Sequence, residues 1–249
     1  MDPFVFFDQN AAAGDETRQF MNAAFVHNPL LDAGGDIGVD ANGFAPGFRL
    51  SYYNFENKPQ SWRVSLGVFG AGARGSNFQR SLAQPMVMLQ AETEQRLLGG
   101  LPGNYRIYAW RNPQAAHFDG SEPERHGGWG LSADQRVGDG MTLFGRYGHQ
   151  LQGNVRFDRA LTLGAEFNGS YWSRGGDSLG VAAGLLKSSR EYRDFAAVGT
   201  AEHVAELYYR YRINKQFELS PNFQYIGNPG GDSAADAVKI LGLRAQLIY

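Results

Sequence analysis

Apolar and polar residues alternate along most of the chain, in stretches of about ten residues. In 204–213, for example, every odd position is apolar or aromatic, whereas the even positions include Glu206, Arg210 and Arg212. Successive side chains of a β-strand point to opposite faces, whereas a helix repeats every ~3.6 residues. The pattern therefore predicts strands with one apolar face and one polar face.

About eleven stretches follow this pattern. The sequence therefore predicts an all-β fold, with antiparallel strands in a single domain over residues 1–249. The expected strands are 48–53, 62–69, 86–97, 104–111, 128–137, 140–149, 158–168, 178–187, 204–213, 216–225 and 238–249.

The connections alternate in length. Gly138-Asp139 and Asn214-Lys215 are short turns, whereas 112–127, 188–200 and 227–237 are long and rich in glycine, proline or polar residues. Short turns on one side and long loops on the other are typical of transmembrane β-barrels of the outer-membrane porin type. We therefore expect such a barrel.

Aromatic residues concentrate near the expected strand ends, as in the interfacial belts of membrane barrels. Trp62, Tyr147, Tyr171, Trp172 and Tyr249 are the examples. A soluble β-sandwich, the alternative, would bury its aromatic residues in a core instead.

The last expected strand ends the chain on an aromatic residue. Leu241, Leu243, Ala245, Leu247 and Tyr249 occupy every second position. This ending resembles the signal by which outer-membrane barrels are recognised by their assembly machinery. We therefore expect that machinery to be a partner.

Composition excludes several other functions. There is no cysteine, and the five histidines are scattered without the spacing of a metal site, so we expect no metal, no cofactor and no catalytic centre. A net charge of −2 gives no electrostatic basis for binding nucleic acid. The first seven residues lack the features of a signal peptide.

Several segments resemble the carbohydrate-selective porins of the OprB type. They are Glu206–Tyr211, Leu219–Ile226, Asn228–Gly231 and Leu241–Arg244, together with Gln19–Asn22 and Ala24–Pro29 upstream. The resemblance covers essentially the whole chain. It implies a location in the bacterial outer membrane, passive diffusion of mono- or oligosaccharides, contact with outer-membrane lipids, and no enzymatic activity; it leaves oligomer formation open.

The resemblance also implies a barrel of about sixteen strands, several of which precede the Phe20 segment. We therefore expect the chain to be the C-terminal portion of such a porin, truncated at the N-terminus, with about 11–12 of 16 strands.

In a porin the polar faces of the strands line the lumen. The alternation nominates thirteen charged residues for this role: Arg49, Arg63, Glu92, Glu94, Arg96, Arg106, Arg136, Arg146, Glu166, Glu206, Arg210, Arg212 and Arg244. Guanidinium groups donate hydrogen bonds to sugar hydroxyls and carboxylates accept them. Beside them, Tyr108, Trp110, Phe144 and Tyr208 are candidates to contact sugar rings. Charged pairs inside a barrel can equally serve only to brace its wall.

Two other functions remain open. A related barrel with a plugged lumen would act as a surface polysaccharide-binding, lectin-like protein. A barrel hydrolase is a minor alternative, because Gly176–Gly180 matches the nucleophile-elbow pattern. An elbow requires a helix after its serine, and here an alternating strand follows. Gly70–Gly75 matches a dinucleotide-binding pattern but has no convincing helix after it.

Overall fold

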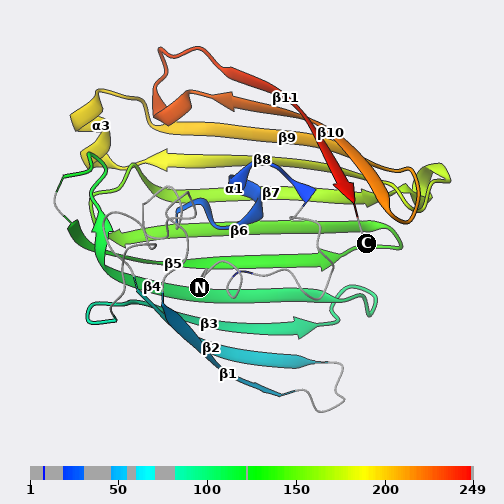
Figure 1. The fold of residues 1–249 in the computed structure, drawn as a ribbon, viewed down its shortest axis with the longest axis horizontal. Helices are drawn as coiled ribbons and strands as arrows, with labels where there is room; N and C mark the ends of the chain where they lie inside the picture. The colour runs from blue at the N-terminus through cyan, green and yellow to red at the C-terminus, as the bar shows by residue number, and fades with distance from the viewer. Residues whose placement is uncertain are drawn as a thin grey trace.

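A single antiparallel sheet of eleven strands, in the order β1 to β11, dominates the computed structural model (Figure 1). The structure describes Asp8 and residues 19–30, 46–54, 60–70, 82–121 and 123–247. Every strand pairs with the strand that precedes it in sequence, so the sheet is a continuous series of hairpins. The expected all-β antiparallel architecture is confirmed.

The strands correspond one by one to those expected from the sequence. They are β1 (Gly47–Asn54), β2 (Ser61–Phe69), β3 (Met86–Gln95), β4 (Gly103–Ala116), β5 (Pro123–Arg136), β6 (Met141–Gln152), β7 (Phe157–Asn168), β8 (Ser178–Ser188), β9 (Ala201–Arg212), β10 (Phe217–Gly227) and β11 (Val238–Leu247).

The helices are short. Those whose bounds fall within the described residues are the α-helices α1 (Ala23–Val26) and α3 (Arg190–Ala196) and the 3-10 turns η4 (Gly169–Trp172) and η5 (Pro229–Gly231). Helix α1 begins after Asn22, whose side chain accepts a hydrogen bond from the backbone N–H of Ala24. Within the described ranges, no helix has the length and apolar character needed to cross a membrane.

The connections differ between the two sides of the sheet on which the strands end. The turns 137–140 and 213–216 lie at one edge, called here the short-turn edge, and the connections 189–200 and 228–237 lie at the other, the long-loop edge. The expected loop 112–127 was too long, because β4 continues to Ala116 and β5 begins at Pro123. The long-loop edge also contains the short connection 153–156.

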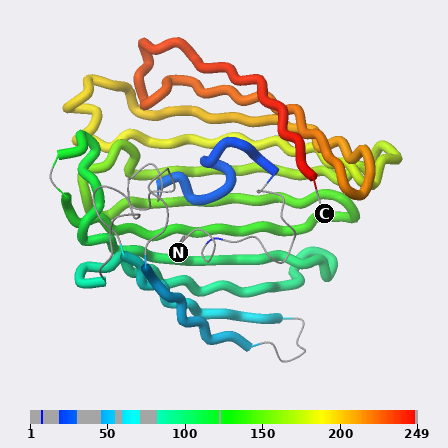
Figure 2. Tube along the Cα trace, in the orientation of Figure 1, coloured from blue at the N-terminus to red at the C-terminus, as the bar shows by residue number. Residues whose placement is uncertain are grey.

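The two faces of the sheet differ as the alternation predicts. The inner face is defined here as the one that carries Phe20, α1 and Asp8; the ribbon and the tube both show the segment around α1 crossing it (Figures 1 and 2). Glu206 on this face is 2% exposed, whereas its neighbour Leu207 on the outer face is 47% exposed. Large apolar residues are exposed along the whole outer face, including Leu163, Leu241 and Leu243.

The predicted aromatic belt is partly wrong. Tyr147 lies in the middle of β6 rather than near its end, because β6 extends to Gln152. Trp62 lies at the start of β2, and Tyr171 and Trp172 lie in η4 at the short-turn edge. Tyr249 lies outside the described residues.

Candidate functional site

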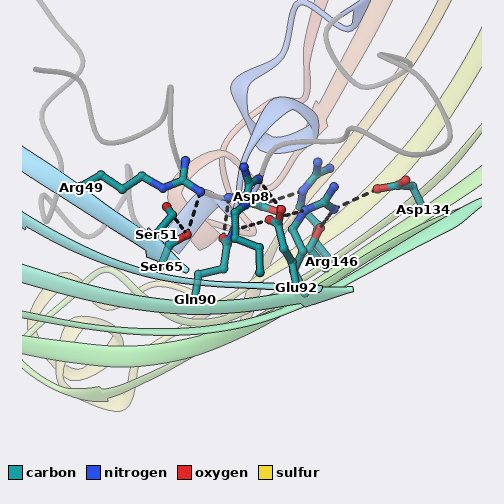
Figure 3. Close-up of polar contacts among 11 residues, drawn as sticks. Asp8, Arg49, Ser51, Ser65, Gln90, Glu92, Asp134 and Arg146 are labelled. Carbon is teal, nitrogen blue, oxygen red and sulfur yellow. Dashed lines mark hydrogen bonds and ion pairs between the residues drawn. The ribbon is translucent and has the colours of Figure 1, made fainter. Parts of the chain in front are cut away.

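A row of charged side chains crosses the inner face from β2 to β5. Arg63, Glu92 and Arg106 occupy directly opposite positions on β2, β3 and β4. Arg63 forms a salt bridge with Glu92, and Arg106 lies 3.8 Å from Glu92 and 2.9 Å from Asp134 of β5 (Figure 3). Alternating signs on adjacent strands stabilise this register, since opposite charges attract across a strand pair.

The row continues toward β1 through hydroxyl groups. Arg49 donates a hydrogen bond of 2.8 Å to Ser65 Oγ, and the hydroxyls of Ser65 and Ser51 are 2.9 Å apart (Figure 3). Gln90 of β3 donates to Glu92 at 2.7 Å. Donors and acceptors therefore follow one another across five strands of the inner face.

Asp8 lies on this row although it belongs to no strand. Its backbone N–H donates to Gln90 Oε1 at 2.9 Å, and its carboxylate accepts from Arg146 Nε of β6 at 2.9 Å (Figure 3). Arg146 also donates to the carbonyl oxygen of Phe25, at 2.9 Å. One guanidinium therefore holds two separate parts of the N-terminal region against the sheet.

The segment 19–30 is attached to the inner face a second time, through Glu206 of β9. The carboxylate of Glu206 accepts hydrogen bonds from the backbone N–H groups of Met21 and Asn22, at 2.9 and 2.8 Å. It also accepts from the side chain of Asn222 on β10, at 2.7 Å. We call residues 19–30 the docked segment.

Aromatic packing completes the docking. The ring of Phe20 contacts the rings of Phe25, Phe144 and Tyr208, with centroid separations of 5.4, 5.6 and 4.9 Å. The hydroxyl of Tyr208 donates to Glu166 of β7. The four aromatic residues proposed to contact sugar rings, Tyr108, Trp110, Phe144 and Tyr208, are all buried in this inner-face cluster.

A second charged cluster lies at the short-turn edge. Asp177, which directly precedes β8, accepts hydrogen bonds from Arg174 at 2.5 Å, from the hydroxyl of Tyr209 at 2.6 Å and from the backbone N–H of Arg212 at 3.0 Å. The bond from Arg174 has the largest effect. Together these bonds lower the pKa of Asp177 to about 2, even though burial opposes the shift. Arg212 in turn pairs with Glu218, at 2.5 Å.

Twelve of the thirteen nominated residues lie on the inner-face positions of the strands. The exception is Arg96, because β3 ends at Gln95 and not at 97 as expected. Its exposed side chain donates to the carbonyl oxygen of Gly100 in the following turn. Arg96 is therefore not part of the inner face.

The twelve differ in their accessibility. Arg106 and Arg146 have side chains 0% and 2% exposed, whereas those of Arg63 and Arg210 are 29% and 20% exposed. Glu94 and Arg244 lie at inner-face positions of β3 and β11, and Arg136 at the end of β5. The deeply buried members are enclosed within the inner face, and the partly exposed ones reach the space that the inner face borders.

Several important residues were missed from the sequence. Asp134 shares the parity of the nominated Arg136 on β5, and Glu218 shares that of the polar, buried Ser220 and Asn222 on β10, so the same alternation already places both on the inner face. Asp8 has no such signal, because it belongs to no strand and its contacts are formed by residues distant in sequence.

Comparison with known proteins agrees with this geometry. One relative is Porin B of Pseudomonas aeruginosa, which is 24% identical in a match that covers 83% of this chain and 53% of that protein. The chain thus spans about half the length of this relative. The solved structure of Pseudomonas putida OprB at high pH superposes with a TM-score of 0.74 and 21% identity, covering 92% of this chain and 64% of that one.

The family model extends over nearly the whole sequence. The model described as the carbohydrate-selective porin, OprB family, matches residues 4–248. It therefore covers both the eleven strands and the docked segment. The chain belongs to the carbohydrate-selective porin, OprB family.

Proposed function

We propose that this chain forms wall strands of a pore in the bacterial outer membrane, for the passive, substrate-selective diffusion of sugars and other small carbohydrates. The single observation that carries the proposal is the contrast between the two faces of the sheet. The outer face exposes large apolar side chains such as Leu163 and Leu207, while arginines and carboxylates gather on the inner face. In a membrane barrel the apolar face contacts lipid and the polar face lines the lumen.

The inner face offers suitable chemistry for sugar hydroxyls. Guanidinium groups donate in a planar fork, and carboxylates accept. Arg106 and Arg146 are buried and paired with Asp134 and Asp8, so we assign them a bracing role. The partly exposed Arg63 and Arg210 are the residues proposed to meet the permeant.

We propose that the docked segment narrows the lumen, because it lies on the inner face. Phe20 and Phe25 are buried on the inner face, and the backbone of Met21 and Asn22 is bound to Glu206. We propose that the permeant passes beside this segment. The assembly machinery would recognise the end of β11 with the residues that follow it.

Single-channel recording of the full chain in a planar bilayer tests the proposal. The variants Arg63→Ala and Arg210→Ala are compared with the outer-face control Leu207→Ala. Loss of one charged hydrogen bond corresponds to about 1.5–3 kcal/mol, so sugar block of the ion current should weaken by roughly ten- to a hundredfold in at least one arginine variant. Both variants should also shift ion selectivity toward cations, because each removes a positive charge.

The possible results separate the alternatives. Shifted selectivity with unchanged sugar block would show arginines that line a pore without binding sugar. If neither selectivity nor sugar block changed, the placement of these residues in the lumen would be wrong.

The docked segment favours one second candidate, a plugged barrel that binds polysaccharide at the cell surface. Its packing against Phe144 and Tyr208 fills part of the inner face. A plugged barrel would neither conduct ions nor admit sugar into liposomes, whereas a pore would do both.

A further inference from the structure

Three basic side chains form a row on the outer face near the long-loop edge. His149 on β6 lies directly opposite Arg159 on β7, and Arg159 lies directly opposite Lys187 on β8. We call these three residues the basic row. Arg159 is exposed, and His149 and Lys187 are half-buried.

The register fixes the direction in which this row points. The next residues on β7 and β8, Ala160 and Leu186, are a directly opposed pair and are 2% and 4% exposed on the inner face. Since neighbouring residues of a strand point to opposite faces, Arg159 and Lys187 point outward. In the adjacent outer-face pair, Leu161 and Leu185 are both exposed.

Two cations directly opposite each other in a strand pair repel and destabilise the pairing. In the part of the chain that the structure describes, neither Arg159 nor Lys187 forms a salt bridge that would offset this repulsion. The outer-face positions of β6, β7, β8 and β9 contain no acidic residue within the described strands. Asp158 lies in the bulge beside Arg159, where the register shifts, and not opposite it.

Protection of an edge strand against pairing with another chain does not explain the row. Charged side chains often prevent the edge strands of a sheet from pairing with other chains. However, β7 and β8 lie in the interior of the sheet, between β6 and β9. The repulsion is therefore retained at a site where it has no protective role.

The position of the row along the strands matches a membrane interface. On β7 the outward residues after Arg159 are Leu161, Leu163, Ala165 and Phe167, which form an apolar band down to the short-turn edge. Arginine on the lipid face of a barrel costs little at the interface but several kcal/mol near the bilayer midplane. The row thus lies where the apolar band ends.

An aromatic ring lies at the same level. Trp129 on β5 is directly opposite His149, and the two rings are 6.1 Å apart. Tryptophan and tyrosine are enriched where membrane proteins meet lipid headgroups. Basic residues beside such rings attract anionic headgroups.

We propose that the basic row binds the phosphate of a lipid, specifically the phosphorylated, acylated sugar headgroup of lipopolysaccharide in the leaflet beside the long loops. Arg159 donates in a fork, Lys187 adds a point charge, and His149 adds a ring nitrogen. The acyl chains lie along Leu161 and Leu185. The proposal rests on the membrane placement argued above and not on sugar selectivity.

Binding of purified lipid A to the full chain in detergent, followed by native mass spectrometry, tests this site. The double variant Arg159→Gln/Lys187→Gln is compared with Lys215→Gln/Arg190→Gln, which removes the same charge from a turn and from α3. The double variant should bind diphosphorylated lipid A at least about tenfold more weakly. The control should bind it as the unmodified protein does.

Two further comparisons identify the ligand group. Lipid A without phosphates should bind the unmodified protein as weakly as the phosphorylated form binds the double variant. Inorganic phosphate, added at the concentration of lipid A, should not displace lipid A. If it does, the row is a site for free anions and the lipid assignment is wrong. Equal binding by the double variant and the unmodified protein would overturn the proposal outright.

Folding and pore function are measured separately on the same samples. The double variant should keep the heat-dependent gel mobility of a folded barrel and its conductance, so that a loss of lipid binding reports on the site alone. If the Gln double variant lost this mobility shift and so did not fold, the variant Arg159→Lys/Lys187→Arg would be used in its place. It keeps both charges and should bind lipid A. Failure of that charge-preserving variant to bind, when folded, would contradict a charge-based site.

Discussion

Arg146 donates a hydrogen bond of 2.9 Å to the carboxylate of Asp8, a residue 138 positions earlier in the chain. Both side chains are 2% exposed. A buried ion pair of this kind is only a weak source of net stability, because both charges lose water. Its effect is specificity: it fixes where the N-terminal region meets the sheet.

Removing one member of this pair should therefore be costly. Arg146→Ala leaves the carboxylate of Asp8 buried without its cation and removes the donor to the carbonyl of Phe25. We expect a loss of about 3–5 kcal/mol in the free energy that holds the N-terminal region in place. Limited proteolysis should then cleave before Leu30 much faster, while Arg136→Ala at the end of β5 changes little. Equal cleavage rates in both variants would refute the bracing role.

Gly148 tests the docked segment from the opposite side. A Cβ atom at this position would lie 2.5 Å from Oδ1 of Asn28 and 2.9 Å from Cδ1 of Leu30, so these two buried side chains would have to move. Gly148→Val should therefore displace the docked segment while leaving the pairing of β6 intact, and raise single-channel conductance. Gly145→Val, on the outer face of the same strand, is the control, because its added carbon meets the exposed side chain of Leu163 and not the docked segment. A variant that conducts like the unmodified pore would show that the docked segment does not restrict the lumen.

The absence of cysteine from the sequence makes the facing of β9 directly measurable. Arg210→Cys should react rapidly with a charged, water-soluble thiol reagent in membranes, because its side chain lies on the inner face and is partly exposed. Leu207→Cys should be protected from that reagent and react with a membrane-soluble one. The reverse order would invalidate the assignment of the two faces.

The cluster around Asp177 predicts a pH dependence. The folded pKa of about 2 lies below the value of about 3.9 for an unfolded aspartate, so this group stabilises the fold above pH ~4 and the contribution is lost as the pH falls toward 2. Urea unfolding should show the unmodified protein more stable than Asp177→Asn near neutral pH. The difference between the two should shrink between pH 4 and pH 2. A constant difference across that range would exclude Asp177 as the titrating group.

The alternation predicted the strands well because each successive position in a barrel wall faces either lipid or the lumen. Leu207 must face lipid and Glu206 must not, so the choice is recorded in the sequence itself. Errors arose where strands end. Arg96 was assigned to a strand because its parity fits, but β3 ends one residue earlier and the side chain bonds to Gly100 instead.

The docked segment marks the limit of this kind of prediction. The motif containing Phe20 was identified only by resemblance, and nothing in its own pattern shows that it would lie across the inner face. Its position depends on Glu206 and Arg146, which are more than a hundred residues away. Tyr208 was correctly placed on the inner face, but its ring packs against Phe20 instead of standing free.

The order of the strands has a consequence for folding and for evolution. Because each strand pairs with its sequence neighbour, every pairing closes only a short loop, and the sheet can grow hairpin by hairpin from either side of an existing one. Insertion or loss of a whole hairpin would change the circumference and preserve the register of all remaining pairs. The long-range contacts of Asp8 and the docked segment depend on β3, β6 and β9 at once, so they form completely only when all three strands have taken their places.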